Sequence, residues 1–282
     1  MERWAMLVAL ALGACSPSPA RQGSPPSQAA GPAAMRVVSL NPCSDAVLAE
    51  VADPAQIAGL SHYSSDPSAS SMDVALAQSF PAVSGAVEEV LALRPDVVVA
   101  GTFLPPATAN ALERTGIRLV RLPTAATIEQ SRAQVMELAQ LVGHADRGRA
   151  LVERIDVALA RAAPPPGTAP VPAVVWQSGG IVPGDDTLIA DVLRHAGFSN
   201  FSATRGFRQA DMLPLERMLA DPPRVILAAG DPRANDDRLL SHPALDALTD
   251  TRRLAFEPAL LWCGGPTIVR AANRLAAVRR AL

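Results

Sequence analysis

The side chains that could support catalysis or metal binding are few and widely spaced. Cys263 precedes Gly264-Gly265-Pro266 at an expected helix start, where an activated thiolate could use His62 as its base. That pairing would describe a cysteine-dependent enzyme, but no G-x-S-x-G, phosphate loop or G-x-G-x-x-G supports catalysis. The four histidines are scattered, and neither H-E-x-x-H nor C-x-x-C spacing occurs. We therefore expect no enzyme, no metal site and no cofactor, with the cysteine enzyme as the alternative class.

Composition narrows the class further. The chain has 282 residues, of which 49% are hydrophobic and 18% charged, so a sizeable core is expected. All 25 basic residues are arginine, and against 27 acidic residues they leave a formal net charge of −2. Because no basic stripe is present, the electrostatic signature of a nucleic-acid-binding protein is missing.

The first residues resemble an export signal rather than part of a fold. Residues 4–13 form a ten-residue apolar run, too short to span a bilayer, and Leu12-Gly13-Ala14-Cys15 resembles the lipobox of bacterial lipoproteins. We expect residues 1–14 to be a lipoprotein signal peptide, with lipidation of Cys15. Residues 15–34 would then form the lipid anchor and a Pro/Ser/Ala tether to a membrane. An ordinary secretory signal is the alternative.

The rest of the chain alternates short apolar runs with helical patterns. Near-continuous apolar runs are typical of parallel strands covered on both faces, and the alternation predicts α/β units. Polar residues suggest helix starts: Ser44 or Asp45, Thr127 with Gln130, and Asp186. The expected strands are residues 36–40, 57–60, 97–100, 117–120, 173–176 and 225–228.

An internal repeat predicts two similar lobes. Residues 88–101 align with residues 216–229, and six of the 14 positions are identical. Each copy reads as glutamate, amphipathic helix, proline turn and buried strand. We expect an N-terminal lobe at 35–143 and a C-terminal lobe at 170–282. Residues 144–169 would form the connection between the lobes, with a helix over residues 145–162 and then a proline-rich turn.

These segments resemble the periplasmic binding proteins for cobalamin and ferric siderophores. The resemblance rests on Arg36-Val-Val-Ser-Leu-Asn-Pro42, Ile57-Ala-Gly-Leu-Ser61 and Glu88-Glu-Val-Leu-Ala-Leu-Arg-Pro-Asp96, with a second-lobe segment at residues 215–220. It implies an α/β fold of two doubly wound lobes joined by a single long helix. It also implies a monomeric receptor in the periplasm, which holds a metal chelate between its lobes and delivers it to the permease and ATPase of an ABC importer.

The resemblance assigns a docking role to one glutamate in each lobe. Glu88 and Glu216 match the positions whose carboxylates contact arginines of the permease. Two exposed acids on opposite lobes would contribute orientation and steering more than affinity. The alternative is that each glutamate merely stabilises the start of its helix.

Ligand contacts are expected from loops at the carboxyl ends of the strands. Aromatic side chains there would form walls for a flat chelate, with a corrinoid preferred over a ferric siderophore. Arg205 and Arg208 could instead meet an anionic siderophore or propionates, and His62-Tyr63 could ligate haem iron. Trp176 lies directly on a strand, so packing within its lobe is an equal alternative. The predicted cleft residues are Asn41, Pro42, Cys43, His62, Tyr63, Phe103, Trp176, Arg205, Phe207, Arg208 and Trp262.

Two thiols remain if Cys15 is lipidated. Cys43 and Cys263 fall in expected cleft loops, one in each lobe, and an oxidising compartment would permit a disulfide between them. The alternatives are two free thiols that face the ligand, or two small buried hydrophobic side chains.

Overall fold

The computed structural model describes Met1 and residues 35–67, 69–230, 240 and 242–282. The described residues from Met35 to Leu282 belong to one compact unit. The expected signal peptide (residues 1–14), and the anchor and tether (residues 15–34), therefore lie outside the described residues apart from Met1. In the described part of the chain, no helix combines the length and the apolar character needed to cross a bilayer.

The first lobe is built on a parallel five-stranded sheet in the order β3-β2-β1-β4-β5. Four expected strands are present here within one or two residues, and β3 was not expected because it has only two residues. The strands are β1 (Val37–Ser39), β2 (Ile57–Ser61), β3 (Ala82–Val83), β4 (Val97–Gly101) and β5 (Arg118–Leu122). The helices are α1 (Pro42–Val51), α2 (Val74–Ala77), α3 (Val87–Ala92), α4 (Pro106–Arg114) and α5 (Ile128–Leu141).

The second lobe is built on a parallel four-stranded sheet in the order β11-β10-β6-β8. A small antiparallel pair, β7 with β9, lies beside it. The strands are β6 (Val171–Gln177), β7 (Ile181–Val182), β8 (Phe198–Asn200), β9 (Asp211–Met212), β10 (Val225–Ala229) and β11 (Arg252–Ala255). The helices are α7 (Leu188–His195), α8 (Leu215–Ala220) and α9 (Pro266–Arg280).

The two sheets share a topology, and the sequence repeat follows it. In the first sheet, β1 pairs with β2 on one side and with β4 on the other. In the second sheet, β6 pairs in the same way with β8 and with β10. The repeat itself becomes α3 followed by β4 in the first lobe and α8 followed by β10 in the second. The expected two-lobe α/β architecture is confirmed.

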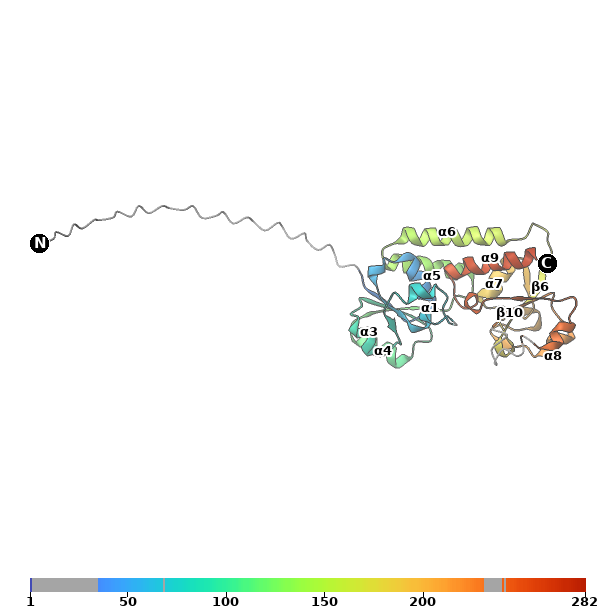
Figure 1. Cartoon of the computed structure of the whole chain (residues 1–282), viewed down its shortest axis with the longest axis horizontal. Helices are drawn as coiled ribbons and strands as arrows, with labels where there is room; N and C mark the ends of the chain where they lie inside the picture. Colours follow the sequence, from blue (N-terminus) through green and yellow to red (C-terminus); the bar gives the residue numbers. More distant parts are fainter. Residues whose placement is uncertain (2–34, 68, 231–239, 241) are drawn as a thin grey trace. The chain divides into compact units, whose positions relative to one another are not determined.

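Helix α6 (Ala145–Ala162) joins the lobes, with the bounds that the sequence predicts. Figure 1 shows α6 along one side of the folded body with α9 beside it, and the two helices are in contact. One hydrophobic cluster includes Val37 of the first sheet and Val175 of the second, together with Leu151 and Ile155 of α6 and Leu275 of α9. The lobes therefore share a core on this side. The opposite face of each sheet has a cluster of its own.

Two of the expected helix starts were misplaced. Helix α1 is capped by Asn41, whose side-chain oxygen accepts the backbone N–H groups of Cys43 and Ser44, so Ser44 and Asp45 lie inside the helix. Helix α7 begins after Thr187, and Asp186 forms an ion pair with Arg208 instead. The hydroxyl oxygen of Thr127 accepts the N–H of Gln130 at the start of α5, as expected.

Candidate functional site: a cleft between the lobes

A cavity of about 450 Å³ is lined by residues from both lobes. The first lobe contributes Phe103, beyond the end of β4, and the loop that precedes α5. The second lobe contributes the ends of β6 and β7, the start of α7 and the loop before α9. The lining residues are Phe103, Thr124, Ala125, Ala126, Gln177, Pro183, Asp186, Thr187, Leu188, Ile189, Gln209, Ala210, Leu261 and Trp262.

A second cavity of about 360 Å³ adjoins the first, because Phe103 lines both. It is bounded entirely by the first lobe, where the carboxyl ends of β1, β2 and β4 meet. We call the two cavities together the interlobe cleft. The residues that line this second part are Leu40, Asn41, Ser61, Tyr63, Val83, Ser84, Gly85, Ala100, Gly101, Phe103, Leu104, Pro105 and Thr108.

Three aromatic side chains expose much of their surface at the cleft. Phe103 is 89% exposed, Trp262 is 55% exposed and Tyr63 is 52% exposed. Exposing so much aromatic surface to water is unfavourable for an unliganded protein, and such surfaces mark binding sites. These three residues and Asn41 are the predicted cleft residues that line the interlobe cleft.

His62 lies behind Tyr63 rather than in the cleft lining. The two rings are 4.1 Å apart, and Nδ1 of His62 is 3.2 Å from the carbonyl oxygen of Val83. Both residues belong to the short 3-10 turn η2 (His62–Ser65), which follows β2 directly. The turn thus presents the phenol of Tyr63 to the cleft, with the imidazole at its side.

Cys43 and Cys263 form a disulfide. The bond joins the first turn of α1 to the segment before α9, next to Trp262. Two glycines after Cys263 allow a close approach of the lobes: a Cβ on Gly264 would overlap the hydroxyl of Ser131, and one on Gly265 would lie 2.6 Å from Val47. Gly265 also has a backbone φ of +58°, a conformation that residues other than glycine rarely adopt. The disulfide therefore joins the lobes where the backbone of the second already packs closely against side chains of the first.

Trp176 does not face the cleft, which corrects its inclusion among the candidate contacts. It is 0% exposed and packs with Met218 and Leu215 of α8, on the face of the second sheet away from the shared core. Because β6 continues to Gln177, Trp176 is still within the strand, where successive side chains point to opposite faces of the sheet. Its side chain lies on the same face as that of Val174. The next residue, Gln177, reaches the cleft instead.

The second-lobe residues 205, 207 and 208 also lie outside the cleft lining. The guanidinium of Arg205 stacks over the ring of Phe201 at 3.3 Å and forms an ion pair with Asp221. Phe207 packs against the core of its own lobe. Arg208 is exposed and donates to Asp186 at 2.8 Å. Neither arginine is among the side chains that line the described cleft, and both are paired with carboxylates.

The loop that carries these residues still builds one wall of the cleft. Its backbone is fixed by hydrogen bonds from the N–H of Asp185 to the oxygen of Phe207 (2.9 Å) and from the N–H of Asp186 to the oxygen of Arg208 (2.7 Å). Gln209 and Ala210 follow and line the cleft. The strand-end rule did not identify them, because they follow no strand of the main sheet. The polar residues Gln209 and Thr124, each in a loop, carry no motif that could have revealed them.

Glu88 and Glu216 occupy equivalent places in the two lobes. Each is an exposed residue in the first turn of a six-residue helix, α3 or α8. Figure 1 shows α3 and α8 at opposite ends of the body, on the side away from α6. The neighbouring Glu89 is engaged locally: its carboxylate accepts both the N–H and the hydroxyl of Ser84 at 2.7 Å, which lowers the pKa of Glu89.

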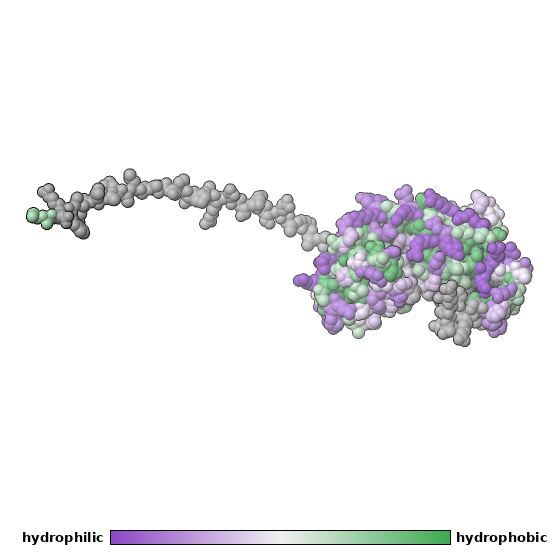
Figure 2. Space-filling model, in the orientation of Figure 1, coloured by the Kyte–Doolittle hydropathy of each residue, from purple (hydrophilic) through white to green (hydrophobic). Residues whose placement is uncertain are grey.

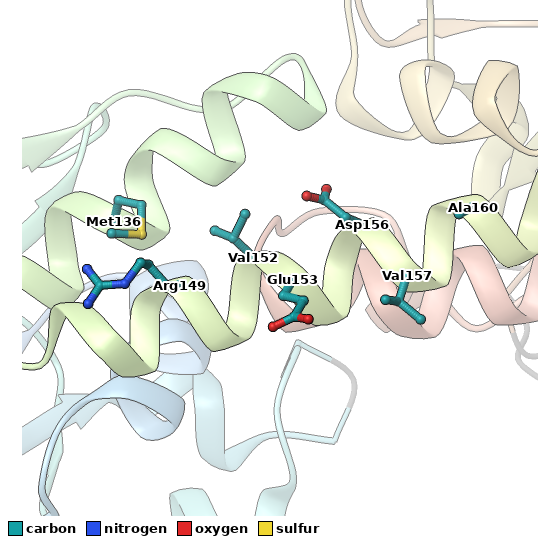
Figure 3. A pocket seen from close by; sticks show the side chains of 7 residues that line it. All are labelled: Met136, Arg149, Val152, Glu153, Asp156, Val157 and Ala160. Carbon is teal, nitrogen blue, oxygen red and sulfur yellow. The ribbon is translucent and has the colours of Figure 1, made fainter.

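Another surface hollow, of about 470 Å³, lies away from the cleft on α6. Figure 3 shows that its side chains come from α6 and, through Met136, from α5. Arg149, Glu153 and Asp156 give it a charged rim, and Figure 2 shows hydrophilic side chains mixed with smaller hydrophobic areas over this side of the body. Within the described residues, no group of three or more His, Cys, Asp or Glu side chains could hold a metal ion.

The fold is similar to solved periplasmic receptors. The haem-binding protein RhuT from Roseiflexus sp. RS-1 is 21% identical, with a TM-score of 0.68 over 86% of this chain and 97% of that one. A periplasmic haem-binding protein from Pseudomonas aeruginosa is 24% identical, with a TM-score of 0.68 over 86% and 92% of the two chains. The vitamin B12-binding protein BtuF of Vibrio cholerae is 17% identical, with a TM-score of 0.68 over 87% and 96%.

By sequence, no curated protein matches the chain. A family model described as periplasmic binding protein matches residues 37–252. That match covers most of the chain, with the whole of the first sheet and β6, β8 and β10 of the second. It agrees with the expectation of a binding protein rather than an enzyme, and with an extracytoplasmic location. The chain belongs to the periplasmic binding protein family.

Proposed function

We propose that this protein is the receptor of an ABC importer for a corrinoid such as cobalamin, which it captures in the interlobe cleft. The observation that carries the choice of ligand is the charge of the cleft lining. Among the described residues that line it there is no arginine or histidine, and its ionisable side chains are Asp186 and Tyr63. A ligand that fits such a lining should carry few negative groups.

A corrinoid meets this condition better than the alternatives. Haem carries two propionates, and burying a carboxylate without a cation is costly. The corrin ring is instead bordered by uncharged amides, which can exchange hydrogen bonds with Gln177, Gln209 and Thr124. Its apolar faces would lie against Phe103 and Trp262.

Haem is the second candidate because of Tyr63. Tyrosine is one of the side chains that ligate haem iron, and the phenol of Tyr63 lines the cleft with His62 beside it. Several proteins of similar fold bind haem. The replacement Tyr63→Phe distinguishes the two ligands: it should abolish the phenolate-to-iron absorption band of a haem complex, but change cobalamin affinity by less than about threefold.

Calorimetric titration of residues 35–282 with cyanocobalamin, haemin and a ferric siderophore tests the proposal. Saturable 1:1 binding of cyanocobalamin would support it, while binding of haemin alone would transfer the assignment to haem. The variant Gln177→Leu should weaken cobalamin binding about tenfold, because it leaves a ligand amide without a partner. Gln78→Leu, at the exposed end of α2, is the matched control. A folded protein that binds none of the three ligands would contradict a chelate receptor.

Delivery to the permease would use Glu88 and Glu216, one from each lobe. Their places at the starts of α3 and α8 support this role, as does their exposure. The lobes would comprise residues 35–143 and 170–282, with 144–169 between them, and the receptor would act as a monomer. Lipidation at Cys15 would hold it at a membrane. In cell fractionation, Cys15→Ser should move the protein from the membrane to the soluble fraction.

A further inference from the structure

A buried carboxyl lies beneath the cleft, and the proposed binding reaction does not use it. Asp45 of α1 is 0% exposed and is absent from the cleft lining. Burial raises the pKa of the Asp45 carboxyl to about 7, while hydrogen bonds from neighbouring serines act in the opposite direction. Burying a carboxylate costs free energy, so the contacts that Asp45 makes must account for its place in the fold.

One contact of Asp45, with the side chain of Ser39, is to β1. The other two hold both ends of one short segment. Oδ2 of Asp45 accepts the backbone N–H of Ser61 at 3.0 Å and the hydroxyl of Ser64 at 2.6 Å. Ser61 ends β2 and Ser64 lies in η2, and the two residues between them are His62 and Tyr63. A single carboxylate oxygen therefore ties down the turn that carries the exposed phenol.

The helix that carries Asp45 is itself firmly held. Two residues before Asp45, Cys43 forms the disulfide to Cys263, and Asn41 caps the same turn. The η2 turn also has a contact with β3, because Nδ1 of His62 lies within hydrogen-bond distance, 3.2 Å, of the carbonyl oxygen of Val83. The turn therefore meets two fixed acceptors, the Asp45 carboxylate on α1 and the carbonyl oxygen of Val83 on β3, and these leave it little freedom to move.

We propose that Asp45 is a positioning residue for Tyr63, which fixes the η2 turn so that the phenol is presented to the interlobe cleft. Asp45 does not line the cleft, and it acts on the turn through the hydrogen bonds to Ser61 and Ser64. The assignment of Tyr63 to the ligand rests on the proposed function, but its positioning is a property of the unliganded protein.

The composition of the chain provides a specific probe. Tyr63 is the only tyrosine, so the full chain labelled with 3-fluorotyrosine gives a single ¹⁹F resonance from this side chain. In the wild type we expect one narrow line. Asp45→Ala should displace and broaden it, because the turn then exchanges between positions. Asp45→Asn keeps an oxygen that can accept both hydrogen bonds, and should restore a line close to that of the wild type.

Matched serine variants separate positioning from a general loss of packing. Ser64→Ala removes the 2.6 Å hydrogen bond and should reproduce part of the change, even if Asp45→Ala fails to fold. Ser79→Ala removes an exposed hydrogen bond at the end of α2 and should leave the Tyr63 line unchanged. An unaltered line in both folded Asp45→Ala and Ser64→Ala would overturn the proposal.

Adding cyanocobalamin tests the proposed function separately. If the ligand contacts Tyr63, the wild-type line should move. Asp45→Ala should then raise the Kd for cobalamin about tenfold, because it displaces the whole ring of Tyr63, whereas Tyr63→Phe removes only the hydroxyl group. If the ¹⁹F line of the wild type does not shift when cyanocobalamin is added, Tyr63 has no role in binding this ligand. That result would leave intact the conclusion drawn from the unliganded spectra.

Discussion

The two lobes have the same sheet topology but place their aromatic side chains differently. In the first lobe, Tyr63 and Phe103 lie beyond the ends of β2 and β4 and are exposed at the cleft. In the second lobe, Trp176 lies within β6 and is buried, and Phe207 packs against the core. Among the described residues of this lobe, Trp262 in the segment before α9 is the one aromatic residue with a largely exposed ring. The difference follows from position relative to the strand: Trp176 alternates towards the core inside β6, whereas Tyr63 and Phe103 lie beyond the last residue of their strands.

The largest expected effect comes from separating the lobes chemically. The double variant Cys43→Ser, Cys263→Ser opens a bond across 220 residues, which could lower the free energy of unfolding by up to about 5 kcal/mol. Denaturant unfolding measures this loss, and the double variant should unfold at a lower denaturant concentration than the wild type. Reductant should lower the midpoint of the wild type but leave that of the double variant unchanged. Equal midpoints for both proteins would show that close packing alone holds the lobes.

The next effect concerns the buried carboxyl of the first lobe. The pKa of Asp45 is raised from 3.8 to about 7 by burial, so the folded state holds its proton more tightly than the unfolded state. Its contribution to stability is therefore complete below pH 4 and is lost as the pH rises to 7, on the order of 4 kcal/mol. Urea unfolding at pH 5 and pH 8 should show about 3 kcal/mol of this fall in the wild type and a smaller fall in Asp45→Asn. The exposed variant Asp73→Asn should keep the wild-type fall.

Aromatic truncation compares the lobes directly. Phe103→Ala and Trp262→Ala should each weaken ligand binding about tenfold, by removing a wall of the cleft, with little effect on unfolding. Trp176→Phe should instead lower the stability of the fold and leave ligand binding unchanged, because that ring packs within the core of the second lobe. Calorimetry and thermal unfolding on the same samples measure both effects. A loss of binding in Trp176→Phe at unchanged stability would place that ring in the site after all.

The smallest effect is expected from the docking pair. Glu88→Gln and Glu216→Gln should each slow ligand transfer to the permease a few-fold, more at low salt, and leave ligand affinity unchanged. Transport into vesicles that contain the cognate permease measures the rate. Glu113→Gln, on the exposed surface of α4, is the control. If either docking variant transfers as fast as the wild type at low salt, the two lobes do not dock through equivalent acids.

By itself, the sequence determined the architecture of the folded body. Apolar runs predicted six strands, because a strand buried on both faces has no polar positions. The repeat of residues 88–101 in 216–229 predicted two lobes, and the helical pattern predicted α6 with its observed bounds. Short strands such as β3 and β7 gave no signal, since two residues cannot show a period.

Only the tertiary structure decided which side chains reach the cleft. The sequence could not distinguish Trp176 from Gln177, because the length of β6 and the face covered by α8 depend on distant residues. The sequence also predicted that Arg205 and Arg208 contact a ligand. In the folded protein Arg205 stacks on Phe201 and forms an ion pair with Asp221. Arg208 forms an ion pair with Asp186. The pairing of Cys43 with Cys263, and the place of Asp45 beneath Tyr63, likewise depend on contacts between segments far apart in the chain. Local sequence patterns indicate the periodicity of helices and strands and the position of turns. Which side chains are buried, and which residues pair, depends on segments that lie far away in the chain.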